Sequence, residues 1–334
     1  MHDAEHSLKQ LENTAFWHEL MPALHTTDTP FENQRISHEL SPELQVHLRK
    51  QMIEDGYFQL PPILNDEETS LLRNLVMQLH QKGIMPIFSA IYDEFWQTLH
   101  RLQGLLAPIL GPGYRLMPDF WVWHVEADDK VAGWGPHRDG NQVPTNIRND
   151  GTPTLCTAWI TLTDVDTTNS CIYLLPRKYD SVFQDFVRRK FGQPGIPNAD
   201  QIPLPLNRIR ALPARAGSIL GWDQNMLHWG SGSSQWASGP RISIGIYYLA
   251  ADTPLMGRPF DNTHRLYIDY ENPACRLTLK DRLTIIANIM DTYANKLEKD
   301  EVHEPHYGST FRAFRERWKM PDHNGLLPDN HRVT

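Results

Sequence analysis

Residues 154–176 read TLCTAWITLTDVDTTNSCIYLLP, two runs of β-branched and apolar residues joined by a short polar turn. Similar runs occur at 114–125 (YRLMPDFWVWHV), 217–222 (GSILGW) and 241–250 (RISIGIYYLA). Short β-prone runs bounded by turn residues predict strands. Because most spacers between them are too short for a helix, we expect antiparallel strands in a barrel or jelly roll, not a parallel array with crossover helices.

Helices are predicted on both sides of these strands, so the expected fold class is mainly β with flanking helices. Residues 64–83 place Asn65 as an N-cap three residues before Glu68, with apolar residues at helical spacing and Gly83 as a stop. A second helix is expected from about residue 86 to 111. Another follows residue 278, and its apolar stripe is interpreted as core or dimer packing: Leu279, Leu283, Ile286, Met290 and Tyr293.

Composition restricts the class of ligand. A formal net charge of −8 over 334 residues disfavours nucleic acid or an anionic membrane as the main partner. Cys156, Cys171 and Cys275 lack the C-x-x-C spacing and cannot form a complete disulfide set, which favours a reduced, cytoplasmic setting. No stretch approaches the roughly 20 apolar residues that cross a bilayer. We therefore expect a soluble protein that acts on a small molecule.

An H-x-D pair, His137 and Asp139, lies in GWGPHRDG at 133–140. Alone it is a weak signal, because a chain with 16 His should contain about one such pair by chance. An iron-binding jelly roll needs a third ligand from a distant strand. His228 follows a strand run and precedes small residues, whereas the later histidines fall after the last predicted strand. Two His and one carboxylate are typical of non-haem Fe(II) oxygenases, although a zinc hydrolase could use the same ligands.

Arg241 favours the oxygenase over the hydrolase. It opens the strand at 241–250, thirteen residues after His228, where its guanidinium could point toward the metal. The planar guanidinium suits two-point binding of a carboxylate, and 2-oxoglutarate needs such an anchor at its far end. Ser243 lies on the same face of the strand and could donate to the same carboxylate.

At this point the chain resembles the phytanoyl-CoA dioxygenase-like family of Fe(II)/2-oxoglutarate oxygenases, which have a double-stranded β-helix core. The resemblance covers about residues 50–250. It is carried in order by EDGYFQLPPILNDEE at 54–68, HRD, AWITLTDVDTTNS, AGSILGW, HWGS and PRISIGIYY. Two motifs depart from the family, which usually has Asn-Gly where this chain has Asn169-Ser170 and Pro-Gly-Ser-His where it has Pro176-Arg177-Lys178-Tyr179.

The resemblance implies that His137, Asp139 and His228 bind Fe(II), and that Arg241 and Ser243 hold the tail carboxylate of 2-oxoglutarate. With O2, such an enzyme hydroxylates or otherwise oxidises an unactivated C–H bond of a small metabolite or natural-product intermediate, releasing succinate and CO2. Related halogenases carry a small residue in place of the carboxylate, so Asp139 favours oxidation over halogenation.

Further residues are weaker candidates. His124 and Glu126 form a rival H-x-E pair, and His124 or Trp159 could instead line the co-substrate pocket. Six tryptophans cluster around the predicted barrel, most of them interpreted as core. Candidate substrate-binding residues are Trp134, Asn141, Gln142, Arg177 and Trp229.

The expected organisation is a helical arm at 1–50, an oxygenase jelly roll at 51–250 and a helical extension at 251–334. An insert at about 181–213 is expected to cross one mouth of the barrel. The extension could cover the active site or build a homodimer. Two other functions stay open: a metal-dependent hydrolase or oxo-acid-independent cupin-type oxygenase, and a non-catalytic ligand-binding jelly roll.

Overall fold

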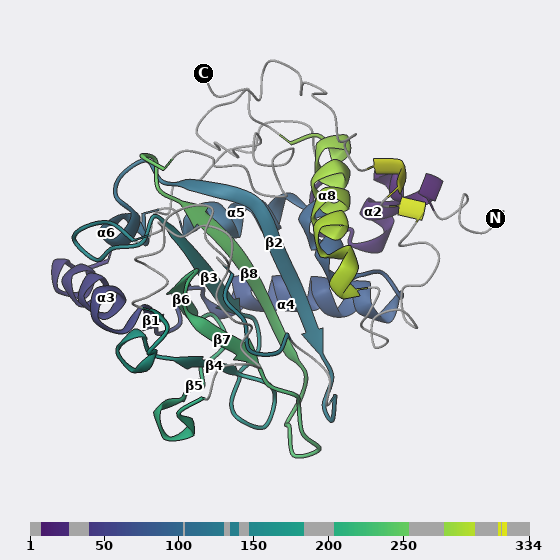
Figure 1. Ribbon diagram of the computed structural model, residues 1–334. Helices are drawn as coiled ribbons and strands as arrows, with labels where there is room; N and C mark the ends of the chain where they lie inside the picture. Colours follow the sequence, from purple (N-terminus) through teal and green to yellow (C-terminus); the bar gives the residue numbers. More distant parts are fainter. Residues whose placement is uncertain are drawn as a thin grey trace.

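Two antiparallel β-sheets form the centre of the molecule, with helices along one side (Figure 1). The computed structural model describes residues 8–26, 40–102, 104–129, 134–139, 147–183, 204–253, 277–297, 313–314 and 316–318. Among these residues, no helix is long and apolar enough to cross a membrane.

The larger sheet has five strands in the order β1-β6-β3-β8-β2, and the smaller has three in the order β5-β4-β7. The larger comprises β1 (Tyr57–Leu60), β6 (Ile219–Asp223), β3 (Leu155–Thr161), β8 (Arg241–Leu249) and β2 (Arg115–Val125). The smaller comprises β5 (Arg210–Leu212), β4 (Ile172–Leu175) and β7 (Leu227–Gly230). All neighbouring strands pair antiparallel. The predicted jelly-roll class with flanking helices is confirmed, and within the described residues the two sheets remain separate.

Each of the five β-prone runs contains one strand, but the sequence did not reveal two of the others. His228 lies within β7, not after a strand as expected. The predicted insert at 181–213 ends in β5, which pairs with β4 and so belongs to the smaller sheet. Residues 184–203 of that insert lie outside the described residues.

The helical layer confirms one prediction and corrects another. Helix α4 (Asp66–Gln81) begins with the predicted capping box between Asn65 and Glu68. The single helix expected from Pro86 is three pieces: η1 (Pro86–Ile91), α5 (Asp93–Arg101) and α6 (Ala107–Leu110). Tyr92 separates η1 from α5, because its extended backbone, at φ −95° and ψ 143°, cannot continue a helix. An amphipathic pattern cannot show such a break, since side chains on both sides of it still face the core.

Helix α3 (Pro42–Asp55) crosses residue 50, the predicted boundary between the helical arm and the jelly roll, and its ends carry ordinary signals. Ser41 caps the first turn, Pro42 occupies the first helical position, and Gly56 closes the helix at φ 82°. Two further helices are α2 (Thr14–Leu20) near the start of the chain and α8 (Leu279–Leu297) near its end. Short 3₁₀ turns lie at η2 (Arg177–Tyr179) and η4 (Leu206–Arg208).

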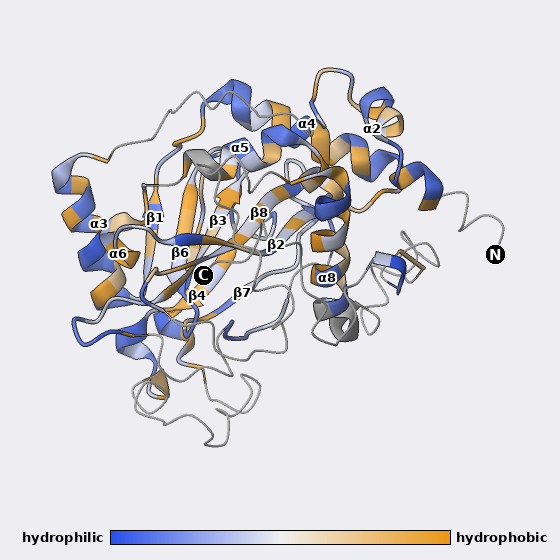
Figure 2. Ribbon diagram, turned by 90° about the horizontal axis from the view of Figure 1, so that it is seen from above, coloured by the Kyte–Doolittle hydropathy of each residue, from blue (hydrophilic) through white to orange (hydrophobic). Residues whose placement is uncertain are grey.

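Strand β8 separates the core from the space between the sheets. Its even-numbered side chains, from Ile242 to Tyr248, are buried in the cluster that includes the helical layer. Its odd-numbered side chains therefore face the other way, because successive residues of a strand alternate between faces. Figure 2 shows β3, β6 and β8 as mainly hydrophobic, while α3 and α4 carry both hydrophilic and hydrophobic residues. In Figure 1, α4 and α5 lie behind the larger sheet and α8 lies beside β2.

Candidate active site

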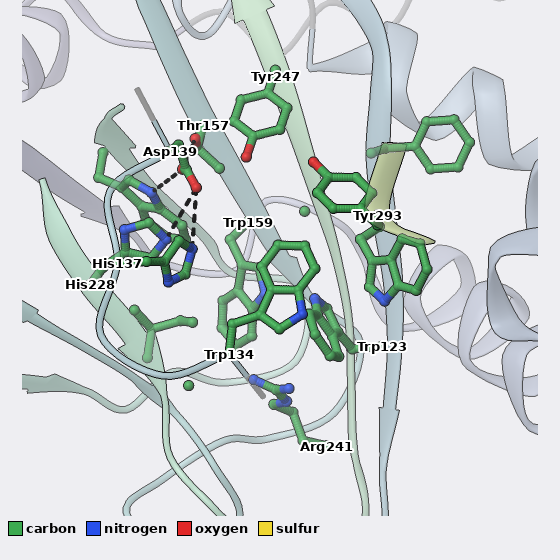
Figure 3. A pocket seen from close by; sticks show the side chains of 16 residues that line it. Trp123, Trp134, His137, Asp139, Thr157, Trp159, His228, Arg241, Tyr247 and Tyr293 are labelled. Atoms are coloured by element: carbon green, nitrogen blue, oxygen red, sulfur yellow. Dashed lines mark hydrogen bonds and ion pairs between the residues drawn. The ribbon is translucent and has the colours of Figure 1, made fainter. Parts of the chain in front are cut away.

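His137, Asp139 and His228 converge on one point beside β7 (Figure 3). The backbone N–H of His137 donates to the His228 carbonyl at 3.0 Å, and the reverse bond has the same length. Asp139 Oδ1 lies 3.3 Å from His137 Nε2 and 3.6 Å from His228 Nε2. The structure thus brings together the three residues predicted to bind metal.

Both imidazoles present the same nitrogen to Asp139. His137 Nδ1 lies 2.8 Å from the Gly135 carbonyl, and His228 Nδ1 lies 3.1 Å from the Met226 carbonyl. A carbonyl oxygen only accepts hydrogen bonds, so each Nδ1 must carry the proton in the neutral ring. Each Nε2 then keeps its lone pair for a cation, which is how outer partners orient metal-binding histidines.

The Asp139 carboxylate is held from its outer side. Its Oδ2 accepts a hydrogen bond from Thr157 Oγ1 at 2.8 Å and another from Trp222 Nε1 at 3.1 Å. Burial raises the pKa of this carboxyl, but positive charge on the His228 and His137 rings, when they are protonated in place of binding a cation, and the bond from Thr157 outweigh it, so the pKa lies well below its ordinary value. The group is therefore an anion at neutral pH, with Oδ1 directed at the two Nε2 atoms.

Arg241 is almost fully buried and only partly paired. Its Nη1 donates to the Ser170 carbonyl at 3.1 Å, whereas Nε and Nη2 have no hydrogen-bond partner among the described residues. Its Cζ lies 5.3 Å from the Trp123 ring centroid and 5.7 Å from that of Trp159. Burial lowers the pKa of Arg241 to about 10, so it stays charged at pH 7. The buried Ser243 hydroxyl likewise has no partner among these residues. An anion is the ligand that would satisfy this guanidinium.

Ser170, one of the residues that depart from the pattern of the similar family, has an unusual backbone conformation. Ser170 has φ 72°, in the left-handed region that glycine adopts without strain. Its carbonyl accepts from Arg241, so the turn that the family usually builds with Asn-Gly here positions the arginine. Its side-chain hydroxyl donates to the Ser231 carbonyl, which ties the turn to the chain after β7.

A pocket joins the triad to Arg241. Its lining is mostly aromatic and draws on both sheets and on α8 (Figure 3). The lining residues are Phe120, Trp121, Trp123, Trp134, His137, Asp139, Thr157, Trp159, Ile172, Trp222, His228, Gly230, Arg241, Gly245, Tyr247 and Tyr293. Trp134 and Trp159, both predicted from sequence to contact a ligand, are among them. Asn141 and Gln142 lie outside the described residues.

Four predicted residues are absent from this lining, and one of them is Ser243, which lies on the Arg241 face of β8. Arg177 bonds to Asp223 at 2.6 Å and to the Ile53 carbonyl at 2.9 Å, so it ties η2 to β6 and α3. Trp229 stacks on Tyr173 at 5.9 Å between ring centroids, away from the lining. His124, next to Trp123 on β2, points to the opposite face.

His124, Glu126 and His80 form a second group of close ligand atoms. The His80 and His124 rings stack at 3.9 Å between centroids with 16° between their planes. The lone pair of an imidazole nitrogen lies in the ring plane, so two nearly parallel rings do not aim at one ion. The triad at His137 is therefore the better metal site of the two.

Sequence reasoning missed four residues that shape the site. Thr157 and Trp222 hold Asp139, and the β8 residue Tyr247 and the α8 residue Tyr293 line the pocket. The alternation of β8 places Tyr247 on the same face as Arg241 and could have identified it. Tyr293 belongs to a helical stripe that otherwise packs into the core, so its sequence pattern carried no signal of a pocket.

Comparisons with known proteins give likenesses to solved structures. No protein-family model and no curated protein matches the sequence. The epimerase SnoN in complex with Fe3+, alpha-ketoglutarate and nogalamycin RO is 19% identical over 65% of this chain and 93% of its own, with a TM-score of 0.47. The alpha-ketoglutarate-dependent carbocyclase SnoK from nogalamycin biosynthesis is 20% identical over 67% and 88%, with a TM-score of 0.47. Iron-bound HygX from Streptomyces hygroscopicus is 14% identical over 64% and 88%, with a TM-score of 0.45.

Proposed function

We propose that this protein is an Fe(II)- and 2-oxoglutarate-dependent oxygenase that hydroxylates, or otherwise oxidises, a C–H bond of a small molecule. The observation that carries the proposal is one pocket holding both a His-Asp-His triad and a buried, partly unpaired arginine. The motifs that resemble the phytanoyl-CoA dioxygenase-like family support the same reading.

The triad fits a six-coordinate Fe(II) ion. His137 Nε2, His228 Nε2 and Asp139 Oδ1 would supply three ligands, the number that leaves positions for a co-substrate and O2 in enzymes with two His and one carboxylate. His137 Nε2 is buried without a hydrogen-bond partner among the described residues, which a metal ion would correct. Thr157 and Trp222 occupy the remaining carboxylate oxygen, so Asp139 is oriented to bind through Oδ1 alone.

Arg241 and Ser243 fit the tail carboxylate of 2-oxoglutarate. The guanidinium Nε and Nη2 can each donate one bond, and the Ser243 hydroxyl can donate a third. Trp123 and Trp159 flank the guanidinium and help to exclude water, which strengthens charge-assisted bonds. Iron with bound 2-oxoglutarate supplies the oxidising chemistry, in which one O2 converts the oxo acid to succinate and CO2 and oxidises the substrate.

The same features disfavour a metal hydrolase. A hydrolase needs a metal-activated water and a path for substrate, but it has no use for an arginine buried beside the metal. Burying a guanidinium without hydrogen-bond partners raises the free energy of the folded protein, and an anionic ligand that pairs with Arg241 would offset this penalty.

The test is a visible titration in the absence of oxygen. Fe(II) is added to the full-length protein, 2-oxoglutarate is titrated, and the charge-transfer band of the chelated complex is followed. We expect the band in the native protein, none in Asp139→Ala, and roughly 10- to 100-fold weaker 2-oxoglutarate binding in Arg241→Ala, since charge-assisted bonds contribute about 1.5 to 3 kcal/mol.

The matched control is Arg215→Ala, because the Arg215 side chain is exposed and lies outside the pocket lining. It should bind 2-oxoglutarate like the native protein. Iron binding without a band would refute the oxo acid and favour a hydrolase or an oxo-acid-independent oxygenase. Failure to bind metal would favour a non-catalytic ligand-binding protein.

A further inference from the structure

The pocket has two chemically different ends, both formed along β8. Arg241, Ser243, Gly245 and Tyr247 follow one another on one face of the strand, and a strand rises about 3.4 Å per residue, so Arg241 and Tyr247 lie roughly 20 Å apart along the backbone. Figure 3 shows the Arg241 side chain at one end and the two tyrosines at the other. If the proposed function holds, 2-oxoglutarate occupies the Arg241 end. The end at Tyr247 then remains for the substrate.

The substrate end has a continuous aromatic wall. Trp134 and Tyr293 lie 5.0 Å apart between ring centroids at an angle of 34°, and Trp121 lies 5.6 Å from Tyr293 at 71°. Trp134 also meets the metal-site His137 edge-on at 5.7 Å. These rings contact one another, so they form a surface and not an open cage. A flat ring of the substrate could stack against this surface, on the side of the pocket next to the triad.

The hydrogen-bonding groups at this end are tyrosine hydroxyls. The Tyr247 hydroxyl lines the pocket, and a phenol is protonated at neutral pH, so it can donate. The Tyr293 hydroxyl donates to Asp119 Oδ1 at 3.1 Å, which fixes the ring against β2. Figure 3 shows the two hydroxyls pointing toward each other. The Tyr247 hydroxyl interacts with that of Tyr293 and with Asp139, so a substrate oxygen would accept from Tyr247 by replacing one of these contacts.

Charge excludes one class of substrate. Apart from the two triad histidines, Arg241 is the single cationic side chain in the described lining, and the co-substrate would neutralise it. Asp139 and the keto-acid carboxylate of the co-substrate would balance the charge of Fe(II), so a carboxylate or phosphate close to the substrate ring would be buried with no remaining cation in the described lining to pair it.

We propose that the substrate is a planar, largely apolar ring system that carries a neutral hydrogen-bond acceptor and no anionic group next to the ring. It stacks on Trp134 and Tyr293, and Tyr247 orients it by donating to the acceptor. Helix α8, from the C-terminal extension, thus supplies a specificity-determining residue through Tyr293. This proposal deepens the proposed function and rests on it for the placement of the co-substrate.

The test compares two probes by calorimetric titration of the metal-free, full-length protein. 2-Naphthol is flat, and decahydro-2-naphthol is its saturated counterpart with the same hydroxyl. Stacking on one ring is worth a factor of about 2 to 12 in affinity. We expect 2-naphthol to bind about 4- to 140-fold more tightly, because it meets two rings. Equal affinities, or no binding of either probe at millimolar concentration, would overturn the proposal.

Three variants locate the binding. Trp134→Leu and Tyr293→Leu should each weaken 2-naphthol binding about 2- to 12-fold with little effect on decahydro-2-naphthol. Tyr247→Phe should weaken both probes, since both hydroxyls accept. Trp236→Leu is the control, because Trp236 is 76% exposed and lies outside the pocket lining. An equal loss of 2-naphthol affinity in Trp236→Leu, or no loss in Tyr293→Leu, would show that the probe binds elsewhere and would refute stacking on the aromatic wall.

The excluded class is tested in Arg241→Ala, in which the arginine cannot capture an added carboxylate. There 2-naphthoate should bind at least tenfold more weakly than 2-naphthol, and equal binding would refute the charge argument. None of these titrations contains iron or 2-oxoglutarate. Their failure would therefore leave the charge-transfer result standing, and a missing band would not alter the probe affinities.

Discussion

The backbones of His137 and His228 hold each other through two reciprocal hydrogen bonds, N–H to carbonyl in both directions, each 3.0 Å long. This bridge places the two imidazole rings 4.3 Å apart between centroids before any ion binds. Thr157 and Trp222 fix the third ligand from the opposite sheet. The proposed metal site is therefore preorganised by the fold, which lowers the entropy cost of ordering these side chains when an ion binds.

Removing the carboxylate charge should disable the metal site while leaving the fold intact. Asp139→Asn preserves the shape of the side chain but removes the anion that faces both Nε2 atoms. We expect Fe(II) affinity to fall by more than the roughly 10- to 100-fold that loss of an outer partner costs. Anaerobic titration of Fe(II) measures it, with circular dichroism as the folding control. Native affinity in this variant would exclude Asp139 as a ligand.

The partner of Asp139 should matter separately from the ligand itself. Thr157→Val has nearly the same volume but removes the hydroxyl that donates to Oδ2. Fe(II) affinity should drop about 10- to 100-fold, as for other outer partners of metal ligands. Thr157→Ser, which retains the hydroxyl, should recover most of the loss. If valine and serine bind Fe(II) equally well, Thr157 does not position the carboxylate.

Strand β8 shows how far a sequence pattern can reach. Ile242 and the other even-numbered side chains are buried in the core. Arg241, Ser243 and Tyr247 lie on the opposite face of the strand, toward the pocket. The period of two is a property of the strand itself, so the sequence alone predicts it. His228 was likewise predicted from its place among strands to lie with His137 and Asp139, and it does, even though the strand that holds it was not recognised.

Tyr293 shows where such patterns stop. It continues the stripe of Leu283, Ile286 and Met290, which are all buried in the core. Helical periodicity tells which face of a helix is covered, but not whether the covering surface is core or cavity. The break at Tyr92 was missed for a related reason, because the pieces on both sides keep apolar residues toward the same core.

The buried His124 should make stability depend on pH. Burial, followed by the neighbouring His80, lowers the pKa of His124 from 6.5 to about 4, and the side chain is 4% exposed. Between pH 6.5 and 4 the unfolded chain binds a proton here that the folded chain does not. The stability contribution is thus complete above pH 6.5 and is lost as the pH falls toward 4, by about 1 to 3 kcal/mol.

Urea unfolding of native protein and His124→Phe across this pH range measures the effect. Phenylalanine keeps a ring against His80 but does not titrate, so the variant should lose less stability on acidification than the native protein. The same change at the exposed His47 serves as the control and should leave the slope unchanged. Parallel pH profiles for all three proteins would contradict the assignment to His124.

Two glycines with similar backbone angles should respond differently to alanine. Gly83 has φ +68° with no atom within 4 Å of an added Cβ, whereas Gly217 has φ +82° and its Cβ would lie 2.6 Å from the Leu64 carbonyl oxygen. Gly217 joins the Leu64 segment to the sheet. The Gly217 carbonyl accepts from Ile63 N at 2.9 Å, and the Gly217 N–H donates to the Thr161 carbonyl at 2.7 Å.

Gly83→Ala should cost about 1 to 2 kcal/mol of stability for the left-handed backbone alone. Gly217→Ala should cost about 2 to 5 kcal/mol, because a backbone clash adds to that strain. Urea unfolding midpoints measure both, and equal losses would show that the Leu64 segment moves aside without cost.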